Sequence, residues 1–545
     1  MKLLKLPLNP LGLYGGLLVR NYAKRALKTE RSRGSLKLAS SVGPKKKIRS
    51  RNSSKDKSES KGPKSFRYGN FGGLKDSVSS NGEGNERLLS KITDFDQLKI
   101  LPSVRTAVRQ IIEAESLYQG NEIIPSPIQV MSIKRMASRL MDPKLQVHAI
   151  AAETGSGKTL AYLVPLLDYL KRQEVEFPEL WESLKDKAVI RSVILVPTHE
   201  LVTQVHDTVS KTEGVLGLHT YKWGAGSPYT EFLDKVKERI DILVTTPAKL
   251  LSLFNIRMIS RADKLLSHVK FMALDEADTL MDQSWIEETH QAIRKMPNAN
   301  HVVFCSATIP TEFNKTLDRL FPTLVSITTP RLHKLPSMLE FKMIDASLNP
   351  YKGSKIKALA QTLYAIVNDG TELDYEKRCI VFVNEKKDVP GVVEKLSKTY
   401  GHDCVGLTGS DTAEDRATKI KTFLDPPRLL RSATTRNSKD RNVRRVKVPD
   451  SNVTIVYDNA ARTEETKSPL KVLVTTDLMA RGLNFKGVRN VILYDVPKTS
   501  IDLVHRAGRT GRMRQSGRVF MIVEKSTKSW ARAIPKVVKK NIAIS

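Results

Sequence analysis

Cysteine is scarce in this 545-residue chain, which has three widely spaced cysteines and no CxxC pair. This scarcity excludes a disulfide framework and a cysteine zinc site, and it fits a reducing compartment. Long apolar runs are also missing, since no stretch approaches the roughly 18 residues that cross a bilayer. We therefore expect a soluble protein that has no membrane partner.

Acidic residues are in short supply as well, with 58 Asp and Glu against 90 Lys and Arg, so the formal net charge is +32. Such an excess argues against acidic proteins and metabolites as partners and makes nucleic acid the first candidate. At roughly 150 residues per domain, the chain has room for three or four domain-sized units.

The first 29 residues contain no acid, although six Lys and Arg surround a short apolar stretch. This pattern is typical of a transit peptide, and residues 20–23 are similar to the cleavage site of mitochondrial presequences. We expect residues 1–22 to be a transit peptide of a protein of the mitochondrial matrix. The basic residues 23–88 contain too little apolar surface to offset ordering entropy and are expected to be disordered. A nuclear or nucleolar signal at Lys45–Arg51, or a basic arm for nucleic acid, is the alternative.

After residue 88, short β-branched runs alternate with helical patterns such as Leu160–Lys171 and Tyr229–Arg239. This alternation predicts an α/β fold with doubly wound parallel sheets. We expect one domain at 89–328, a linker at 329–337 and a second domain at 338–524. The expected strands are Gln146–Ala151, Val189–Val196, Ile240–Thr245, Val269–Leu274, His301–Cys305, Leu339–Ile344, Cys379–Asn384, Lys471–Thr476, Val488–Tyr494 and Arg518–Val523.

A glycine-rich segment lies between the first expected strand and the helix that follows it. Its glycines allow backbone N–H groups to curl around phosphates, where Lys158 would reach the β and γ phosphates and Thr159 would hold Mg²⁺. The strict pattern has Gly where Ala152 stands, so the rule is met only in part and a plain turn is the alternative. The phosphate-binding residues of this interpretation are Ala152, Glu153, Thr154, Gly155, Ser156, Gly157, Lys158 and Thr159.

An acidic motif, Asp275–Asp278, follows the apolar run 271–274. An acid at the carboxyl end of a strand faces the ligand crevice of an open α/β sheet. Asp275 is therefore expected to bind the metal ion, and Glu276 to position the attacking water. A solvated acidic turn is the alternative, and the pairing with Lys158 argues against it.

These two motifs resemble those of the DEAD-box ATP-dependent RNA helicases, and the resemblance extends through most of residues 95–524. It implies two tandem RecA-like domains that bind ATP and Mg²⁺ in the cleft between them. Asp278 and Asn484 would join the nucleotide-binding set, Asn484 standing where the family has an aspartate. The residues that would couple the ATP site to RNA are Ser306, Thr308, His505 and Arg506.

The segment His505–Arg512 looks like the arginine motif of the family's second domain. Its arginines at 506, 509 and 512 are separated by glycine and can present guanidinium groups across the cleft to a γ phosphate. Arg509 and Arg512 are accordingly assigned to catalysis, with a surface basic patch as the alternative.

Adenine recognition is assigned to Gln129 in the segment Pro125–Gln129. A glutamine amide can donate to N7 and accept from the N6 amino group of adenine, which is the geometry by which Gln reads adenine in DNA. The family's upstream aromatic would be Phe95, for which a plain core phenylalanine is an equal interpretation.

The resemblance also implies an RNA-backbone site, but several positions depart from the family. His199 replaces an arginine, and Ala248, Lys249 and Ala413 also differ from the pattern. The catalytic set is intact while the RNA-facing set has drifted, so ATPase chemistry is a safer prediction than strand separation. The matching positions are Pro197, Thr198, Gly224, Gly226, Thr246, Pro247, Arg416 and Thr476.

One basic segment, the insert at 426–470, has no counterpart in the family. It carries eight Lys or Arg and one acid between Arg428 and Lys447, which indicates either a solvated loop or an RNA-docking arm. The tail at 525–545 is also basic, with Trp530 as a possible anchor and a short helix as one interpretation.

We expect an ATP-dependent RNA helicase that acts as a monomer on structured RNA or ribonucleoprotein. It is most similar to the fungal mitochondrial members of the family that act in large ribosomal subunit assembly, which makes mitochondrial ribosomal RNA the expected partner. Two alternatives stay open: an ATP-gated RNA clamp or chaperone with little unwinding, and a DNA translocase of the wider superfamily.

Overall fold

The computed structural model describes residues 91–115, 123–259, 261–329, 332–335, 338–372, 375–428, 443–447, 454–458, 470–480, 482–511 and 516–540. The predicted transit peptide and nearly all of the basic extension therefore lie outside the described residues. Within them, no helix combines the length and apolarity that a membrane span needs.

The first domain is built on a sheet of parallel strands in the order β3-β4-β2-β5-β6-β1-β7. Its central strands are buried along their whole length, which explains why most of their residues are apolar. The strands are β1 (Gln146–Ala151), β2 (Ile190–Leu195), β3 (Thr220–Trp223), β4 (Ile240–Thr245), β5 (Phe271–Leu274), β6 (His301–Ser306) and β7 (Val325–Thr328).

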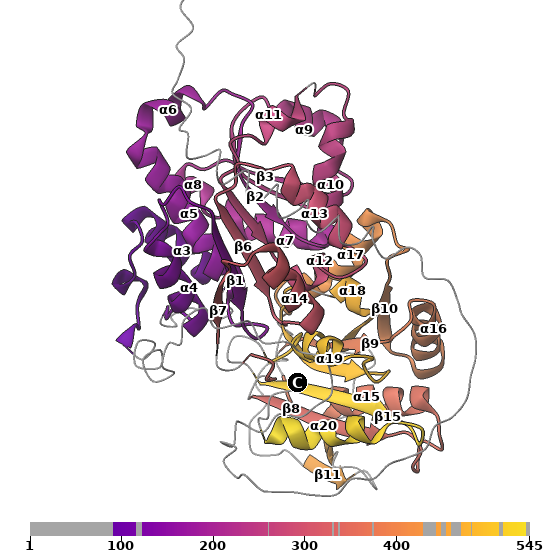
Figure 1. Cartoon of the computed structure of the whole chain (residues 1–545). Helices are drawn as coiled ribbons and strands as arrows, with labels where there is room; N and C mark the ends of the chain where they lie inside the picture. The colour runs from indigo at the N-terminus through magenta and orange to yellow at the C-terminus, as the bar shows by residue number, and fades with distance from the viewer. Residues whose placement is uncertain are drawn as a thin grey trace, which may run out of the picture.

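Helices cover both faces of this sheet (Figure 1). Along β1, Ile150 packs into one apolar core whereas Val147 and Ala149 pack into the other, as strand alternation requires. The helices are η2 (Phe95–Gln97), α3 (Pro102–Glu115), α4 (Pro127–Ala137), α5 (Lys158–Glu176), α6 (Pro178–Ser183), α7 (His199–Ser210), α8 (Glu213–Leu216), α9 (Tyr229–Lys235), α10 (Pro247–Ser252), η3 (Leu253–Asn255), α11 (Ala262–Leu265), α12 (Ala277–Leu280), α13 (Ile286–Arg294) and α14 (Thr311–Leu320).

The second domain repeats this architecture with a parallel sheet in the order β10-β13-β9-β14-β15-β8. It also has an apolar core on each face of the sheet. Its elements are β8 (Leu339–Asp345), α15 (Lys355–Asn368), β9 (Lys377–Phe382), α16 (Asp388–Tyr400), β10 (Asp403–Leu407), α17 (Ala413–Leu424), β13 (Leu470–Thr475), α18 (Asp477–Ala480), β14 (Val488–Leu493), α19 (Ser500–Ala507), β15 (Gly517–Val523) and α20 (Ser529–Lys539).

The doubly wound α/β fold expected from the sequence is confirmed, and every expected strand is present within one or two residues of its bounds. Three strands of the two parallel sheets were not anticipated: β3, β7 and β10. Each lies at the edge of its sheet and has five residues or fewer. An edge strand buries less of its surface, so its apolar pattern is weaker.

Part of the basic insert forms an antiparallel pair of strands, β11 (Val443–Lys447) and β12 (Thr454–Asp458), in which Val443 is opposite Asp458. Figure 1 places β11 at the end of the second domain that is remote from the first domain. The short helix considered for the tail is α20, which packs on the second domain through Ala531, Ile534 and Val537.

Candidate active site and RNA path

The glycine-rich loop adopts a conformation that its glycines make possible. Gly155 and Gly157 have positive φ angles of 78° and 84°, which side chains of L-residues rarely tolerate. A Cβ on Gly157 would also lie 2.4 Å from Nε2 of Gln129. Ala152 is not in this region of φ, and its N–H donates to the Ser306 carbonyl across the β1–β6 pairing. Ala152 continues the strand, which explains why glycine is not needed there.

Lys158 begins α5, and its ammonium group turns back over the loop. Its Nζ donates to the carbonyls of Ala152 and Glu153, both at 3.0 Å. Thr159 follows in the first turn of the same helix. The loop and the helix N-terminus thus bring together a cation, a hydroxyl group and backbone N–H groups, the groups that bind polyphosphate.

Gln129 lies directly against this loop. In the first turn of α4, its Oε1 accepts from the Ser126 N–H at 2.8 Å, and its Nε2 donates to the Gly157 carbonyl at 3.2 Å. A carboxamide has two N–H bonds and two acceptor lone pairs, so one of each remains beyond these two bonds. The placement is compatible with the adenine-reading role, which stays a prediction. Phe95 is fully buried in the core of the first domain.

Asp275 lies at the carboxyl end of β5 and is buried. Its two oxygens accept from the Tyr162 hydroxyl at 3.0 Å and from the Glu276 N–H at 2.9 Å. Burial, and then the negative charge of Glu276, raise the pKa of Asp275 to about 6, although the Glu276 N–H and the Lys158 charge act against the shift. Tyr162 was not predicted from the sequence, yet it is four residues after Lys158 and hence on the same face of α5.

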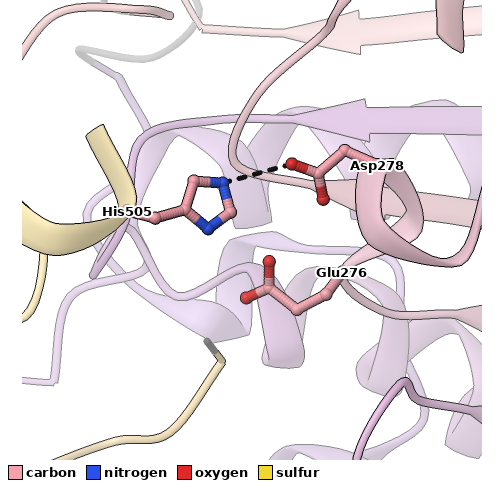
Figure 2. Close-up of side chains that lie close together, drawn as sticks. All are labelled: Glu276, Asp278 and His505. Carbon is pink, nitrogen blue, oxygen red and sulfur yellow. Dashed lines mark ion pairs between the residues drawn. The ribbon is translucent and has the colours of Figure 1, made fainter. Parts of the chain in front are cut away.

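Glu276 occupies an unusual backbone conformation immediately after Asp275. Its φ of 49° and ψ of 47° are left-handed, a region that is uncommon for residues other than glycine. Its Oε2 is buried and has no hydrogen-bond partner among the described residues. Figure 2 shows its carboxylate directed into the same space as the His505 ring.

A chain of polar contacts crosses from the first domain to the second. Thr308 donates its hydroxyl to Asp278 Oδ2, and the same oxygen lies 3.1 Å from His505 Nε2 in α19 (Figure 2). Thr308 is held in turn by Ser306, whose Oγ accepts from the Thr308 N–H at 3.2 Å. Four residues that the sequence singled out are thus connected, with Asp278 in contact with both domains.

The sequence predicted that Arg506 would point across the cleft to a γ phosphate, but in the structure it binds acceptors of the second domain. The Arg506 guanidinium forms a bidentate pair with Asp477 at 2.6 and 2.7 Å and donates to Asn384 Oδ1 at 2.7 Å. These partners belong to its own domain, so Arg506 does not reach across the cleft as the sequence interpretation had it. A guanidinium this deeply buried needs acceptors close by, and its own domain supplies them.

Arg509 and Arg512 were assigned to catalysis. Arg509 is buried and donates to the carbonyls of His505, Ala480 and Leu483 at 2.9–3.2 Å. Arg512 lies outside the described residues. Their action on a γ phosphate therefore stays a prediction.

The arginine motif nevertheless packs directly on the phosphate loop of the other domain. A Cβ placed on Gly508 would lie 1.9 Å from Oγ1 of Thr154. Only glycine allows this approach, so the second domain touches the first at the glycine-rich loop in this structure.

The predicted RNA residues of the first domain lie side by side on one edge of the sheet. Strands β2, β3 and β4 are neighbours, and Trp223 is opposite Thr245 in the register. Gly224 and Thr246 directly follow β3 and β4, and Thr198 lies three residues after the end of β2. Pro197 precedes Thr198, Gly226 continues the loop after β3 with a φ of 81°, and Pro247 begins α10. At about 4.8 Å per strand, the three loops span about 10 Å.

His199, which stands in place of an arginine, is fixed by the loop after β3. Its Nδ1 accepts from the Ala225 N–H at 2.9 Å. Burial, and then the charges of Arg416 and Lys249, lower the pKa of His199 despite the opposing charge of Glu200. The side chain is therefore neutral at neutral pH and offers its Nε2–H as a donor.

Helix α7 carries further contacts to the second domain that the sequence did not reveal. Arg416 Nε lies 2.5 Å from Glu200 Oε1, and the Asn484 N–H donates to Gln204 Oε1 at 2.5 Å. Arg416 thus pairs with an acid of the first domain, whereas Thr476 lies at the carboxyl end of β13. Glu200 and Gln204 are four residues apart, so helical spacing places them on one face, but nothing in the spacing names their partners.

Comparison with known proteins agrees with this geometry. Residues 126–316 match the DEAD/DEAH box helicase family and residues 449–514 match the helicase conserved C-terminal domain. The chain is 60% identical to the protein named ATP-dependent RNA helicase MRH4, mitochondrial, of Vanderwaltozyma polyspora, over 96% of this chain and 98% of that protein. It is also 60% identical to the protein of that name from Saccharomyces cerevisiae, over 88% of each chain.

Solved structures show the same fold. S. cerevisiae Dbp5 bound to RNA and ADP BeF3 covers 82% of this chain and 93% of its own, with a TM-score of 0.57 and 20% identity. Mss116p bound to ssRNA and AMP-PNP covers 88% and 81%, with a TM-score of 0.59 and 19% identity.

The names of the relatives confirm the predicted mitochondrial location. Both family models are matched in the expected order along the chain, and the identity to the relatives extends over nearly all of it. The chain therefore belongs to the DEAD-box family of ATP-dependent RNA helicases.

Proposed function

We propose that this helicase remodels structured RNA or ribonucleoprotein in the mitochondrial matrix, as a monomer, during assembly of the large ribosomal subunit. The observation that carries the mechanism is the Asp278–His505 contact, because it joins the acidic motif of one domain to the arginine motif of the other. The net charge of +32 supports an extended RNA partner such as mitochondrial ribosomal RNA.

Nucleotide chemistry is assigned to the residues that surround the cleft. Lys158 and the loop Ala152–Gly157 bind the phosphates, and Glu276 orients the attacking water with its free carboxylate oxygen. The oxygen donors of Thr159 and Asp275 suit Mg²⁺, which prefers hard ligands and keeps much of its water. When bound, Mg²⁺ offsets the negative charge that develops on the phosphates.

RNA binding is assigned to the edge of the first sheet and to Thr476 of the second domain. Binding across both domains favours the closed arrangement, in which His505 meets Asp278 and Gly508 meets Thr154. Hydrolysis then releases RNA, because the γ phosphate no longer holds the domains together. Each cycle thereby couples the hydrolysis of one ATP to one round of RNA binding and release.

An ATP-gated clamp with little unwinding is the second candidate, and two observations favour it. His199 is neutral where the family has a cation, and Arg416 is engaged by Glu200. Both features weaken the electrostatic grip on the RNA backbone.

A strand-displacement assay separates the two candidates. A helicase displaces a short strand from an RNA duplex only with ATP, whereas a clamp shows ATP-dependent binding without displacement. Stimulation of the ATPase by DNA as strong as that by RNA would instead indicate the DNA translocase. RNA crosslinking in cells, followed by sequencing, tests the ribosomal assignment, which fails if the large-subunit RNA is not enriched.

A further inference from the structure

An aromatic and cationic cluster continues the predicted RNA edge beyond the positions that match the family. It consists of Trp223 at the end of β3, Tyr229 at the start of α9 and Lys249 in the first turn of α10. Helices α9 and α10 lie next to each other on the first domain (Figure 1). Because β3 is the outermost strand of the sheet, the cluster lies at the outer end of the row of predicted RNA-binding loops.

The Lys249 ammonium is held by two rings. Its Nζ is 4.9 Å from the Trp223 ring centroid and 4.7 Å from that of Tyr229, distances at which a cation is attracted to an aromatic face. Trp223 is fully buried and stacks on Phe232. The lysine is thus fixed on a rigid base within the turn that begins at Thr246.

Tyr229 is positioned but not covered. Its ring meets Trp223 edge-on, with the centroids 6.2 Å apart, and 48% of the residue stays exposed. A large aromatic side chain held in place loses little entropy when it binds a ligand, and exposed aromatics beside a basic groove are the platforms on which single-stranded bases stack.

Given the RNA path proposed above, on which this inference depends, we propose that Tyr229 and Lys249 form an additional RNA subsite at the outer end of that path. Tyr229 stacks on a base of single-stranded RNA, and Lys249 contacts the adjoining phosphate. The subsite offers a cation on the same domain where His199 has lost one. Stacking is tolerant of sequence, so the subsite adds affinity and fixes the strand without selecting bases.

The test measures RNA affinity with a non-hydrolysable ATP analogue over a range of salt concentrations. Loss of a base stack costs about 1–3 kcal/mol, so Tyr229→Ala should weaken binding roughly 5- to 150-fold without changing the slope of log affinity against log salt. Tyr229→Phe keeps the ring and should bind like wild type. Lys249→Met should lower the slope by roughly 0.7, the value for one phosphate of a single strand.

Two further variants separate stacking from folding. Tyr229→Leu keeps an apolar contact with Trp223 but has no aromatic face, so it should lose as much affinity as Tyr229→Ala. Tyr400→Ala is the matched control, because Tyr400 is also an exposed tyrosine, with 40% of the residue exposed. It is the last residue of α16, just before the start of β10 and so away from the carboxyl ends of the strands. It should bind RNA like wild type.

The outcomes are distinct. Wild-type affinity in Tyr229→Ala and Tyr229→Leu, while RNA still stimulates the wild-type ATPase, overturns the subsite and leaves the proposed function standing. An ATPase of the wild-type protein that RNA does not stimulate overturns the proposed function instead. An unchanged salt slope in Lys249→Met would refute the proposed contact between Lys249 and a phosphate.

Discussion

Glu200 and Arg416 join the two domains through an ion pair of 2.5 Å in which both side chains are nearly buried, with exposed fractions of 11% and 14%. They are 216 residues apart in the chain. The arginine that the family pattern assigns to RNA is therefore a contact between domains in this structure.

This pair predicts a charge-reversal phenotype. Arg416→Glu or Glu200→Arg alone places like charges together, so the RNA concentration for half-maximal ATPase stimulation should rise at least about tenfold. The double variant restores opposite charges and should recover most of the loss. If Arg416 instead binds an RNA phosphate, the double variant will need as high an RNA concentration for half-maximal stimulation as Arg416→Glu.

Glu276→Gln should separate ATP binding from hydrolysis. The amide preserves shape but cannot act as a base or orient water as a carboxylate does, so turnover should fall by about 10²- to 10⁴-fold. Binding of a fluorescent ATP analogue should persist, and RNA should be trapped with ATP. Lys158→Ala is the contrasting variant, since it removes a phosphate contact and should weaken nucleotide binding itself. Wild-type hydrolysis by Glu276→Gln would refute the role of this carboxylate.

Arg512→Ala and Arg509→Ala should each reduce turnover by about 10³- to 10⁵-fold if they act on the γ phosphate. Nucleotide affinity should change less. Because Arg509 also bonds to three carbonyls, its variant needs a thermal melting curve beside the rate. Arg506→Ala serves as the reference for a structural loss, since it orphans Asp477 and should lower the melting temperature. Normal turnover in the first two variants would mean that the second domain does not contribute to the chemistry.

The basic insert should contribute to the salt dependence of RNA binding. Neutralising Arg441, Arg444 and Arg445 removes three cations, so the slope of log affinity against log salt should fall by roughly two units. The matched control neutralises Lys185, Lys187 and Lys237, exposed lysines that precede β2 and β4 and so lie at the edge of the first sheet opposite the RNA loops. Equal slopes for the insert variant and wild type would identify a solvated loop or a protein-binding surface.

A fluorescent protein fused after Tyr68 should enter mitochondria, because the acid-free first 29 residues form a positively charged leader. The same fusion starting at Ala23 lacks the leader and should stay in the cytosol. Fluorescence in the nucleus would identify Lys45–Arg51 as the signal.

Features that depend on local sequence were predictable, and contacts between distant segments were not. Buried strands such as β1 and β5 showed as largely apolar runs. Lys158 begins the helix after the loop that follows β1, and Asp275 directly follows β5. In contrast, β10 contains Asp403 and Gly406, which are unfavourable in strands. Tyr229 and Lys249 meet only because β3 and β4 are neighbours in the sheet, and Glu200 finds Arg416 only after both domains have folded. No periodicity encodes those pairings.

The approach of Gly508 to Thr154 bears on the order of events in the catalytic cycle. With the second domain resting on the phosphate loop, that side of the loop is closed to exchange with solvent. Nucleotide must enter while the domains are apart, and inorganic phosphate must leave after they separate again. A protein that holds the domains apart would therefore speed exchange without touching the nucleotide.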